Sequence, residues 1–247
     1  MRMLSALSIS ITLLAITLMA TPVSAKKPPV ATWGFELRLG SYEPTLAETQ
    51  QYQQHFGNDS DLLMSVEFDR YLTYLLGNFG VFMQVGLWKD SGKSRSCADA
   101  AGATVSCSSA SVVTNVAGSQ KEKMQLIPLS VGAMYRMDLL KRHLNVPLVP
   151  YAKVGFNAVY WSHTAGGKSS SFADGSSGDG WSTGFHGAVG VGLNLDWIST
   201  DYSDEHRLFI DSFFFAEVIR LWADGFGEAI FDMSDTQVTF GLAFDFD

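Results

Sequence analysis

The sequence predicts an all-β protein, a closed antiparallel up-and-down transmembrane β-barrel of about eight strands whose apolar side chains point outward. Three observations predict it. Hydrophobic residues make up 47% of the chain, yet beyond residue 25 no apolar run approaches the length of a membrane-spanning helix. Apolar and polar residues instead alternate in about eight segments. The connections between these segments are alternately long and short.

Alternation with a period of two defines each expected strand. The segments are 33–40, 62–72, 80–88, 125–136, 150–161, 184–196, 207–220 and 236–247. One face is large and apolar, and the other carries Gly, Ala, Ser or isolated charges. The seventh segment is ambiguous because Phe213, Phe214 and Phe215 are consecutive, and we place Asp211 and Glu217 on its polar face.

The connection lengths predict an orientation. Most of the connections after the first, third, fifth and seventh segments are long, and the others are short or moderate. The long ones cover residues 41–61, 89–123, 162–180 and 221–235. In a barrel with an even number of strands, both termini then lie beside the short turns. This is the arrangement of outer-membrane barrels, with short periplasmic turns and long extracellular loops.

A water-soluble β-sandwich or lipocalin-like barrel also alternates, but with its apolar face inward. The polar faces here are small and carry isolated charges, which suits a narrow lumen better than a solvated exterior. Aromatic residues also fall at the expected strand ends, where membrane barrels carry aromatic girdles. These are Trp33, Trp88, Tyr135, Tyr160, Trp161 and Trp197. Both features favour the membrane barrel.

Residues 1–25 are typical of a cleaved secretory signal peptide. Arg2 precedes an apolar run, and Val23 and Ala25 form an A-x-A-like cleavage site. We expect residues 26–247 to form one outer-membrane β-barrel domain. Because Arg2 is the only charged residue removed, the mature chain carries 16 Lys and Arg against 25 Asp and Glu, a net charge of −9. This acidic balance argues against nucleic-acid binding.

The last segment resembles the terminal assembly signal of outer-membrane proteins. Thr239, Gly241, Phe244 and Phe246 occupy its polar, glycine and two aromatic positions. The resemblance implies recognition by the barrel-assembly machinery, with periplasmic chaperones as earlier partners. Asp247 departs from the pattern because it follows the final aromatic residue.

Nearly the whole mature chain is also similar to a family of small, OmpA-like outer-membrane β-barrel proteins known mostly from myxobacteria and other Gram-negative bacteria. The phrases that carry the likeness are WGFELRLGSYEP, VEFDRYL, LIPLSVGAMYRMDLL, VPLVPYAKVGFNAVYW and GLAFDF. The resemblance implies the fold and an outer-membrane location, with membrane lipid and lipopolysaccharide as partners. It implies no particular activity.

The predicted phase directs charges of both signs into a lumen that an eight-stranded barrel fills with side chains. They are Glu36, Arg38, Glu67, Asp69, Arg136, Lys153, Asp211, Glu217 and Asp245. Because an unpaired buried charge is costly, we expect an ion-pair network that plugs the barrel. The extracellular loops would then carry the function, in surface interaction or envelope integrity. A narrow gated channel for ions or small solutes is the alternative.

A lipid- or peptide-modifying enzyme is a third interpretation. Ser162 and His163 are the candidate pair, with Asp174 or Asp179 as the orienting acid, but adjacent strand residues point to opposite faces. Residues 178–180 and four acidic loop residues could bind Ca²⁺, but they lack the spacing of a calcium loop. The four are Asp224, Glu228, Asp232 and Asp235. We expect no catalytic residue, no metal site and no cofactor.

The two cysteines, Cys97 and Cys107, lie in one loop rich in Ser and Ala. A secreted chain meets an oxidising compartment, so we expect them to form a disulfide. Two free thiols are the alternative.

Overall fold

The computed structural model describes residues 31–45, 52, 56, 61–101, 104–105, 114–169, 178–195, 209–227 and 232–247. The expected signal peptide lies outside these residues. The described residues belong to one structural unit, which begins at Ala31. None of the helices in this unit is long and apolar enough to cross a membrane.

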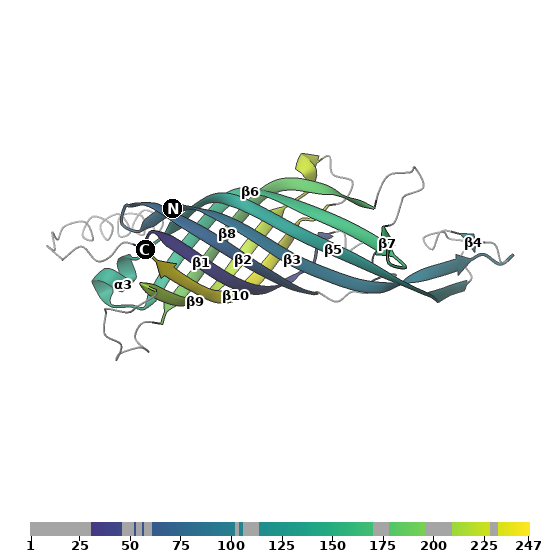
Figure 1. Cartoon of the computed structure of the whole chain (residues 1–247), viewed down its shortest axis with the longest axis horizontal. Helices are drawn as coiled ribbons and strands as arrows, with labels where there is room; N and C mark the ends of the chain where they lie inside the picture. Colours follow the sequence, from purple (N-terminus) through teal and green to yellow (C-terminus); the bar gives the residue numbers. More distant parts are fainter. Residues whose placement is uncertain are drawn as a thin grey trace, which may run out of the picture. The chain divides into compact units, whose positions relative to one another are not determined.

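Eight long antiparallel strands form a closed barrel (Figure 1). They are β1 Trp33–Tyr42, β2 Asp61–Tyr74, β3 Asn78–Ala98, β5 Thr114–Arg136, β6 Leu148–Ala165, β8 Asp179–Asn194, β9 Asp211–Trp222 and β10 Asp235–Phe246. Each pairs with the next long strand along the chain, and β1 pairs with both β2 and β10. That last pairing closes the ring, so the predicted up-and-down barrel is confirmed.

The shorter elements were not predicted. They are β4 Thr104–Val105, α3 Leu139–Leu144, β7 Lys168–Ser169 and the 3₁₀ turn η4 Gly225–Gly227. The C-terminus and α3 lie at one end of the barrel, and β4 and β7 lie toward the other (Figure 1).

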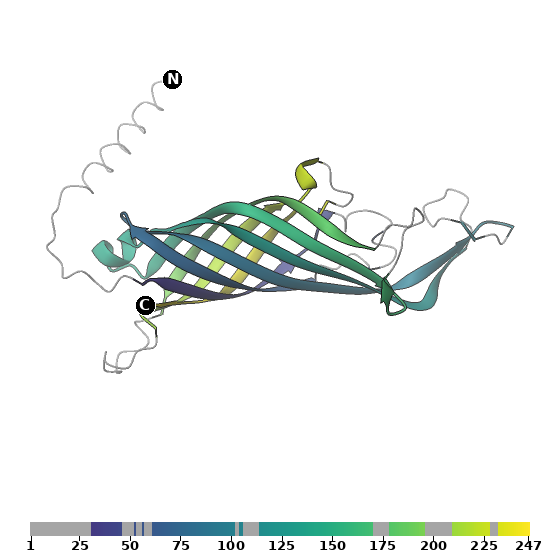
Figure 2. The same ribbon diagram turned by 45° about the horizontal axis from the view of Figure 1, so that its top comes forward.

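The predicted loop 89–123 is wrong over much of its length. There β3 continues to Ala98 and β5 already begins at Thr114, so the two strands extend past the barrel as a hairpin (Figure 2). The sequence of this extension has few large apolar residues. Its strands therefore lack the apolar period that marks the rest of the barrel.

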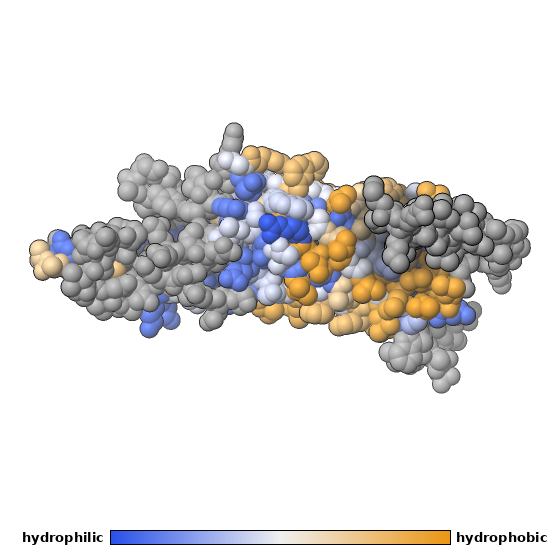
Figure 3. Space-filling model, turned by 180° about the vertical axis from the view of Figure 1, so that it is seen from behind, coloured by the Kyte–Doolittle hydropathy of each residue, from blue (hydrophilic) through white to orange (hydrophobic). Residues whose placement is uncertain are grey.

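Exposed and buried residues alternate along the strands with the predicted phase. Every one of the eight long strands presents large apolar side chains outward, including Leu37, Met64, Met83, Val131, Val154, Val189, Val218 and Phe240. Figure 3 shows hydrophobic side chains gathered on the barrel wall on one face of the molecule. A soluble barrel would bury these residues. The predicted outward orientation of the apolar faces is therefore confirmed.

The structure resolves the consecutive phenylalanines of β9. Phe213 and Phe215 point into the lumen and are 4% and 1% exposed, whereas Phe214 points outward and is 46% exposed. Glu217 lies on the same face as Phe213 and Phe215, as the two-residue period requires.

The prediction of an aromatic girdle is wrong for two of its six residues. Trp88 and Trp161 are almost fully buried and face the lumen, because each lies an even number of residues from inward neighbours on its own strand. Trp33, Tyr135 and Tyr160 lie on the outer face. Trp197 lies outside the described residues.

Candidate functional site

The centre of the lumen holds two cations among three carboxylates. Arg38 of β1 lies 2.8 Å from Glu67 and 2.7 Å from Glu217, and it also pairs with Glu36. Lys153 of β6 lies 3.1 Å from Glu36 and 3.8 Å from Glu217, and it also pairs with Glu67. Each cation therefore contacts all three carboxylates. All five residues are buried.

A third cation extends this network toward the end of the barrel that holds the C-terminus. Arg136 of β5 donates a 2.7 Å hydrogen bond to Asp245, which also accepts one of 2.8 Å from the Tyr71 hydroxyl. The same guanidinium lies 3.7 Å from Glu36 and 3.9 Å from Asp69. Arg136 thus links Asp245 on β10 to the central cluster through Glu36.

Asp69 is the least satisfied acid of the network. Neither of its carboxylate oxygens has a hydrogen-bond partner, although the side chain is buried. Oxygens of Glu36, Glu67 and Asp69 lie within 4.8 Å of one another, a spacing that could hold a hard cation. However, the groups beside Glu36 and Glu67 are Arg38 and Lys153. The geometry therefore describes ion pairing better than metal coordination.

The other half of the lumen is filled by apolar side chains, which we call the apolar plug. It comprises Tyr42, Leu63, Trp88, Met124, Leu126, Val159, Trp161, Ile219, Leu221 and Met233. The Trp88 indole donates to the Tyr42 carbonyl at 3.1 Å, and the Tyr42 hydroxyl donates to the Met233 carbonyl at 2.6 Å. The polar ends of these aromatic side chains are thus satisfied inside the plug.

Little space remains in the ionic half. A cavity of about 10 Å³ lies among Glu36, Arg136, Tyr151 and Phe213, and about that volume is needed to hold one water molecule. A solute of sugar size is far larger. Among the described residues the lumen therefore holds an ionic cluster and an apolar cluster, which favours the plugged barrel expected from the sequence.

Asp211 does not join the central network, contrary to the sequence prediction. It pairs with Lys141 of α3 at the mouth of the barrel, where both side chains are about a quarter exposed. Asp138, just before α3, accepts a 3.1 Å hydrogen bond from Asn78 and lies 3.5 Å from Arg142. Burial raises the pKa of the Asp138 carboxyl, although Arg136 and Arg142 oppose the shift. The turn that holds α3 thus adds charge pairs to this mouth.

The candidate hydrolase pair is not assembled. Ser162 lies opposite Gln125 and Asp179 in the sheet, whereas His163 points to the other face, 3.6 Å from Glu122. Asp179 is thus on the face of Ser162 and cannot orient His163. Asp174 lies outside the described residues. This arrangement does not support the activated nucleophile that the enzyme interpretation requires.

The acidic loop residues bind backbone groups of their own turns. Asp224 accepts from the Phe226 N–H at 3.0 Å, and Asp232 accepts from the Ser234 N–H at 2.9 Å. Asp235 accepts from the adjacent Thr236 N–H at 2.6 Å and, from a segment distant in sequence, the Glu43 N–H at 3.0 Å. Glu228 lies outside the described residues. The three described acids therefore have a structural role in ordering turns.

The terminal strand closes the barrel against β1. Phe246 lies opposite Trp33, and Gly241 lies opposite Arg38. A β-carbon at Gly241 would come within 2.6 Å of the Phe215 ring and 2.0 Å of the Leu37 carbonyl oxygen, so only glycine fits. Thr239 is buried, and Asp247 accepts a 2.9 Å hydrogen bond from Thr32. Their role in assembly remains a prediction.

Cys97 is buried near the end of β3, opposite Val105 of β4. Cys107 lies outside the described residues, so the disulfide between them stays a prediction.

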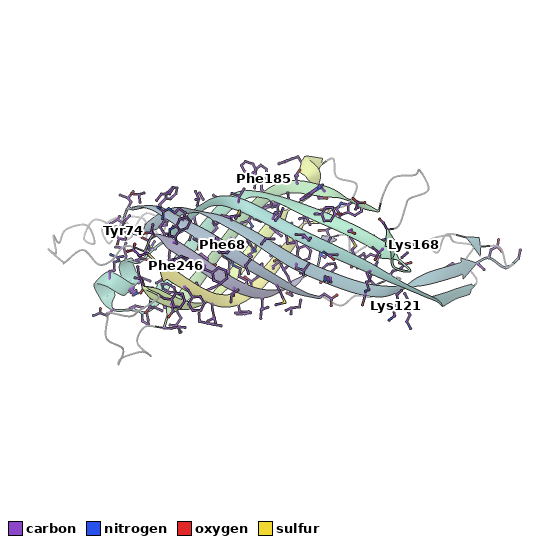
Figure 4. All side chains as sticks on the ribbon, viewed as in Figure 1. Phe68, Tyr74, Lys121, Lys168, Phe185 and Phe246 are labelled. Atoms are coloured by element: carbon purple, nitrogen blue, oxygen red, sulfur yellow. The ribbon has the colours of Figure 1, made fainter. Side chains whose placement is uncertain are left out.

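The sequence analysis overlooked a set of exposed lysines on the β3–β5 hairpin. Lys89 and Lys93 on β3, with Lys121 and Lys123 on β5, point to the outer face, and we call these four residues the basic face. The even spacing within KDSGK and KEK could have revealed it, since residues two or four apart on a strand share a face. Figure 4 shows Lys121 extending from the hairpin side of the barrel.

No known protein family and no curated protein matches this sequence. Among solved structures, the attachment invasion locus protein Ail of Yersinia pestis, in complex with the heparin analogue sucrose octasulfate, matches with 8% identity and a TM-score of 0.40, over 87% of this chain and 96% of that chain. The N-terminal β-barrel domain of OprF from Pseudomonas aeruginosa matches with 12% identity and a TM-score of 0.37, over 88% and 100%. At such low scores, the assignment of the barrel rests on its own strand register.

Proposed function

We propose that the chain is a small integral outer-membrane β-barrel protein with a blocked lumen, which acts through its extracellular end in surface interaction or envelope integrity. The observation that carries the proposal is the combination of an apolar outer wall with a filled interior. A closed barrel satisfies the backbone hydrogen bonds of all its strands, so an apolar wall can face lipid. The filled lumen leaves the loops and the β3–β5 hairpin as the surfaces available to partners.

The proposal includes the steps before insertion. A signal peptide of residues 1–25 would export the chain, periplasmic chaperones would carry it, and the barrel-assembly machinery would read Thr239, Gly241, Phe244 and Phe246. In the membrane the protein would contact lipid and lipopolysaccharide. We propose no catalytic role, because the one candidate nucleophile and its candidate base lie on opposite faces of β6.

Labelling of lysines in intact cells tests the location and orientation. An amine-reactive reagent that cannot cross the outer membrane should label Lys121 and Lys168, which lie at the hairpin end of the barrel (Figure 4). Lys141, in α3 at the opposite end, should be labelled only after the outer membrane is permeabilised. Peptide mass spectrometry reads out each site. Labelling of Lys141 alone in intact cells would reverse the orientation, and equal labelling of all three would refute membrane insertion.

A further inference from the structure

We propose that the basic face and an adjoining apolar groove bind one phosphorylated glycolipid of the outer leaflet, lipopolysaccharide, with its phosphate groups on the lysines and its acyl chains in the groove. The inference rests on the proposed outer-membrane location and identifies a lipid partner together with its site on the barrel.

The four lysines form an uncompensated positive surface on an acidic protein. Lys93 lies directly opposite Lys121 in the β3–β5 pair, and Lys89 is a diagonal neighbour of Lys123. Like charges placed directly opposite each other destabilise a sheet. Within the part of the chain that the structure describes, none of the four has an ion-pair or side-chain hydrogen-bond partner. A bound polyanion would supply the missing negative charge.

The acids of the same segment are directed to the opposite face. Asp90, next to Lys89, accepts a 2.6 Å hydrogen bond from the Tyr52 hydroxyl. Glu122, between Lys121 and Lys123, is buried and lies 3.6 Å from His163. The strand period thus separates the charges of this segment, lysines outward and acids inward. Among the described charged residues of these two strands, the outward-pointing ones are all lysines, although Asp61 and Asp90 line one hollow together with Lys89 and Lys123.

The lysines begin where the apolar side chains of β3 end. Lys89 follows the exposed, apolar Leu87 on β3 by two residues, about 7 Å along the strand. Lys93 lies about 13 Å farther along. The lysines therefore begin at the edge of the apolar wall, and Lys89 and Lys93 stand at different distances from that edge. A lipid that carries several phosphates fits this ladder better than a phospholipid with a single phosphate.

The apolar wall below the lysines is hollowed. A groove of about 920 Å³ runs over β1, β2, β3 and β10, lined by Leu37, Met64, Val85, Leu87, Phe240 and Leu242. Gly86 and Gly241 form part of its floor, although their β-carbon positions face the lumen. On β3 the groove residue Leu87 is followed on the same face by Lys89. An apolar recess that ends at a cationic ladder is complementary to a phosphorylated, multiply acylated lipid.

Binding of purified rough lipopolysaccharide to the refolded full-length barrel in neutral detergent, measured by native mass spectrometry, tests the inference. The variants K93Q/K121Q and K89Q/K123Q should each bind at least tenfold more weakly than the wild type. The matched control R70Q/R220Q also removes two outer-face positive charges, but outside the basic face, and should change affinity less than twofold. Enzymatically dephosphorylated lipopolysaccharide should bind the wild type as weakly as native lipopolysaccharide binds the variants.

Three outcomes would overturn the inference. An equal loss of affinity in R70Q/R220Q would show that binding depends only on the net charge of the protein. Equal affinity for phosphatidylglycerol would make the ligand an ordinary phospholipid, and tighter binding of heparin would make it an extracellular sulfated glycan. Heat-modifiable migration of each variant on gels shows that the barrel is folded, and insertion into phosphatidylcholine vesicles tests the proposed function separately. Normal insertion without selective lipopolysaccharide binding would therefore refute only this inference.

Discussion

Removal of the Lys153 charge tests whether the lumen is a dry ion-pair network. Lys153→Met keeps most of the volume of the side chain but removes an ammonium group that contacts three buried carboxylates. Around Lys153 the described network holds five acids, Glu36, Glu67, Asp69, Glu217 and Asp245, against Arg38, Arg136 and Lys153. The variant leaves five acids facing two cations.

The expected loss of stability follows from the two closest contacts. Lys153 hydrogen-bonds Glu36 at 3.1 Å and also bonds Glu67, and charge-assisted hydrogen bonds contribute about 1.5–3 kcal/mol each. Removal of one partner from a buried pair costs about 3–5 kcal/mol, because the remaining charge is left unpaired. We therefore expect Lys153→Met to lower the free energy of unfolding by about 3–5 kcal/mol.

Urea unfolding of the vesicle-inserted barrel, followed by tryptophan fluorescence, measures this change. Lys168→Met is the matched control, since Lys168 is exposed in β7 and its replacement should stay within about 0.5 kcal/mol of the wild type. The double variant Lys153→Met/Glu67→Gln should recover part of the loss, because it also removes one of the unpaired acids. A Lys153→Met barrel as stable as the control would mean that the lumen is hydrated, and the reasoning would fail.

Three further predictions concern assembly, the hairpin and conductance. Phe246→Lys should leave secretion intact but lower insertion, measured as the heat-modifiable fraction, whereas deletion of Asp247 should not; normal insertion of Phe246→Lys would contradict the assembly signal. Cys97 and Cys107 should resist maleimide in the denatured, unreduced protein, and their ten-residue loop would contribute about 3 kcal/mol to the hairpin alone; two reactive thiols would show that the disulfide is absent. The refolded protein should show no steady conductance in planar bilayers, and large, salt-proportional channels would favour transport.

The sequence was sufficient to predict the strands, their phase and the closed barrel. Each strand has one face toward the apolar exterior and one toward the lumen. The two-residue alternation therefore indicates both that a segment is a strand and which of its residues point inward. The inward positions of Arg38, Glu67 and Lys153 follow from that phase alone. Which acid pairs with which cation does not follow, because the register between strands that are distant in sequence, such as β1 and β10, sets those distances.

Positions near strand ends were less predictable. Trp88 and Trp161 look like girdle residues by their position, but parity places them in the lumen, where they build the apolar plug. Asp211 has the parity of Glu217 but lies at the mouth, where α3 supplies Lys141 as its partner. The sequence offered no apolar period from which to expect α3, so this ion pair could not be foreseen.

The small residues of the lumen explain how a barrel of this size can be blocked without strain. A β-carbon on Gly180 would lie 2.7 Å from the Trp161 ring, and one on Gly190 would lie 2.5 Å from the Tyr151 ring. Each glycine therefore provides the space that a large side chain on the neighbouring β6 strand occupies. Small and large inward residues in this way complement one another across the strand pair, which is how narrow barrels are filled. The glycine-rich inner faces, read from the sequence as a sign of a narrow lumen, are thus what allows the apolar plug and the ionic network to fit inside it.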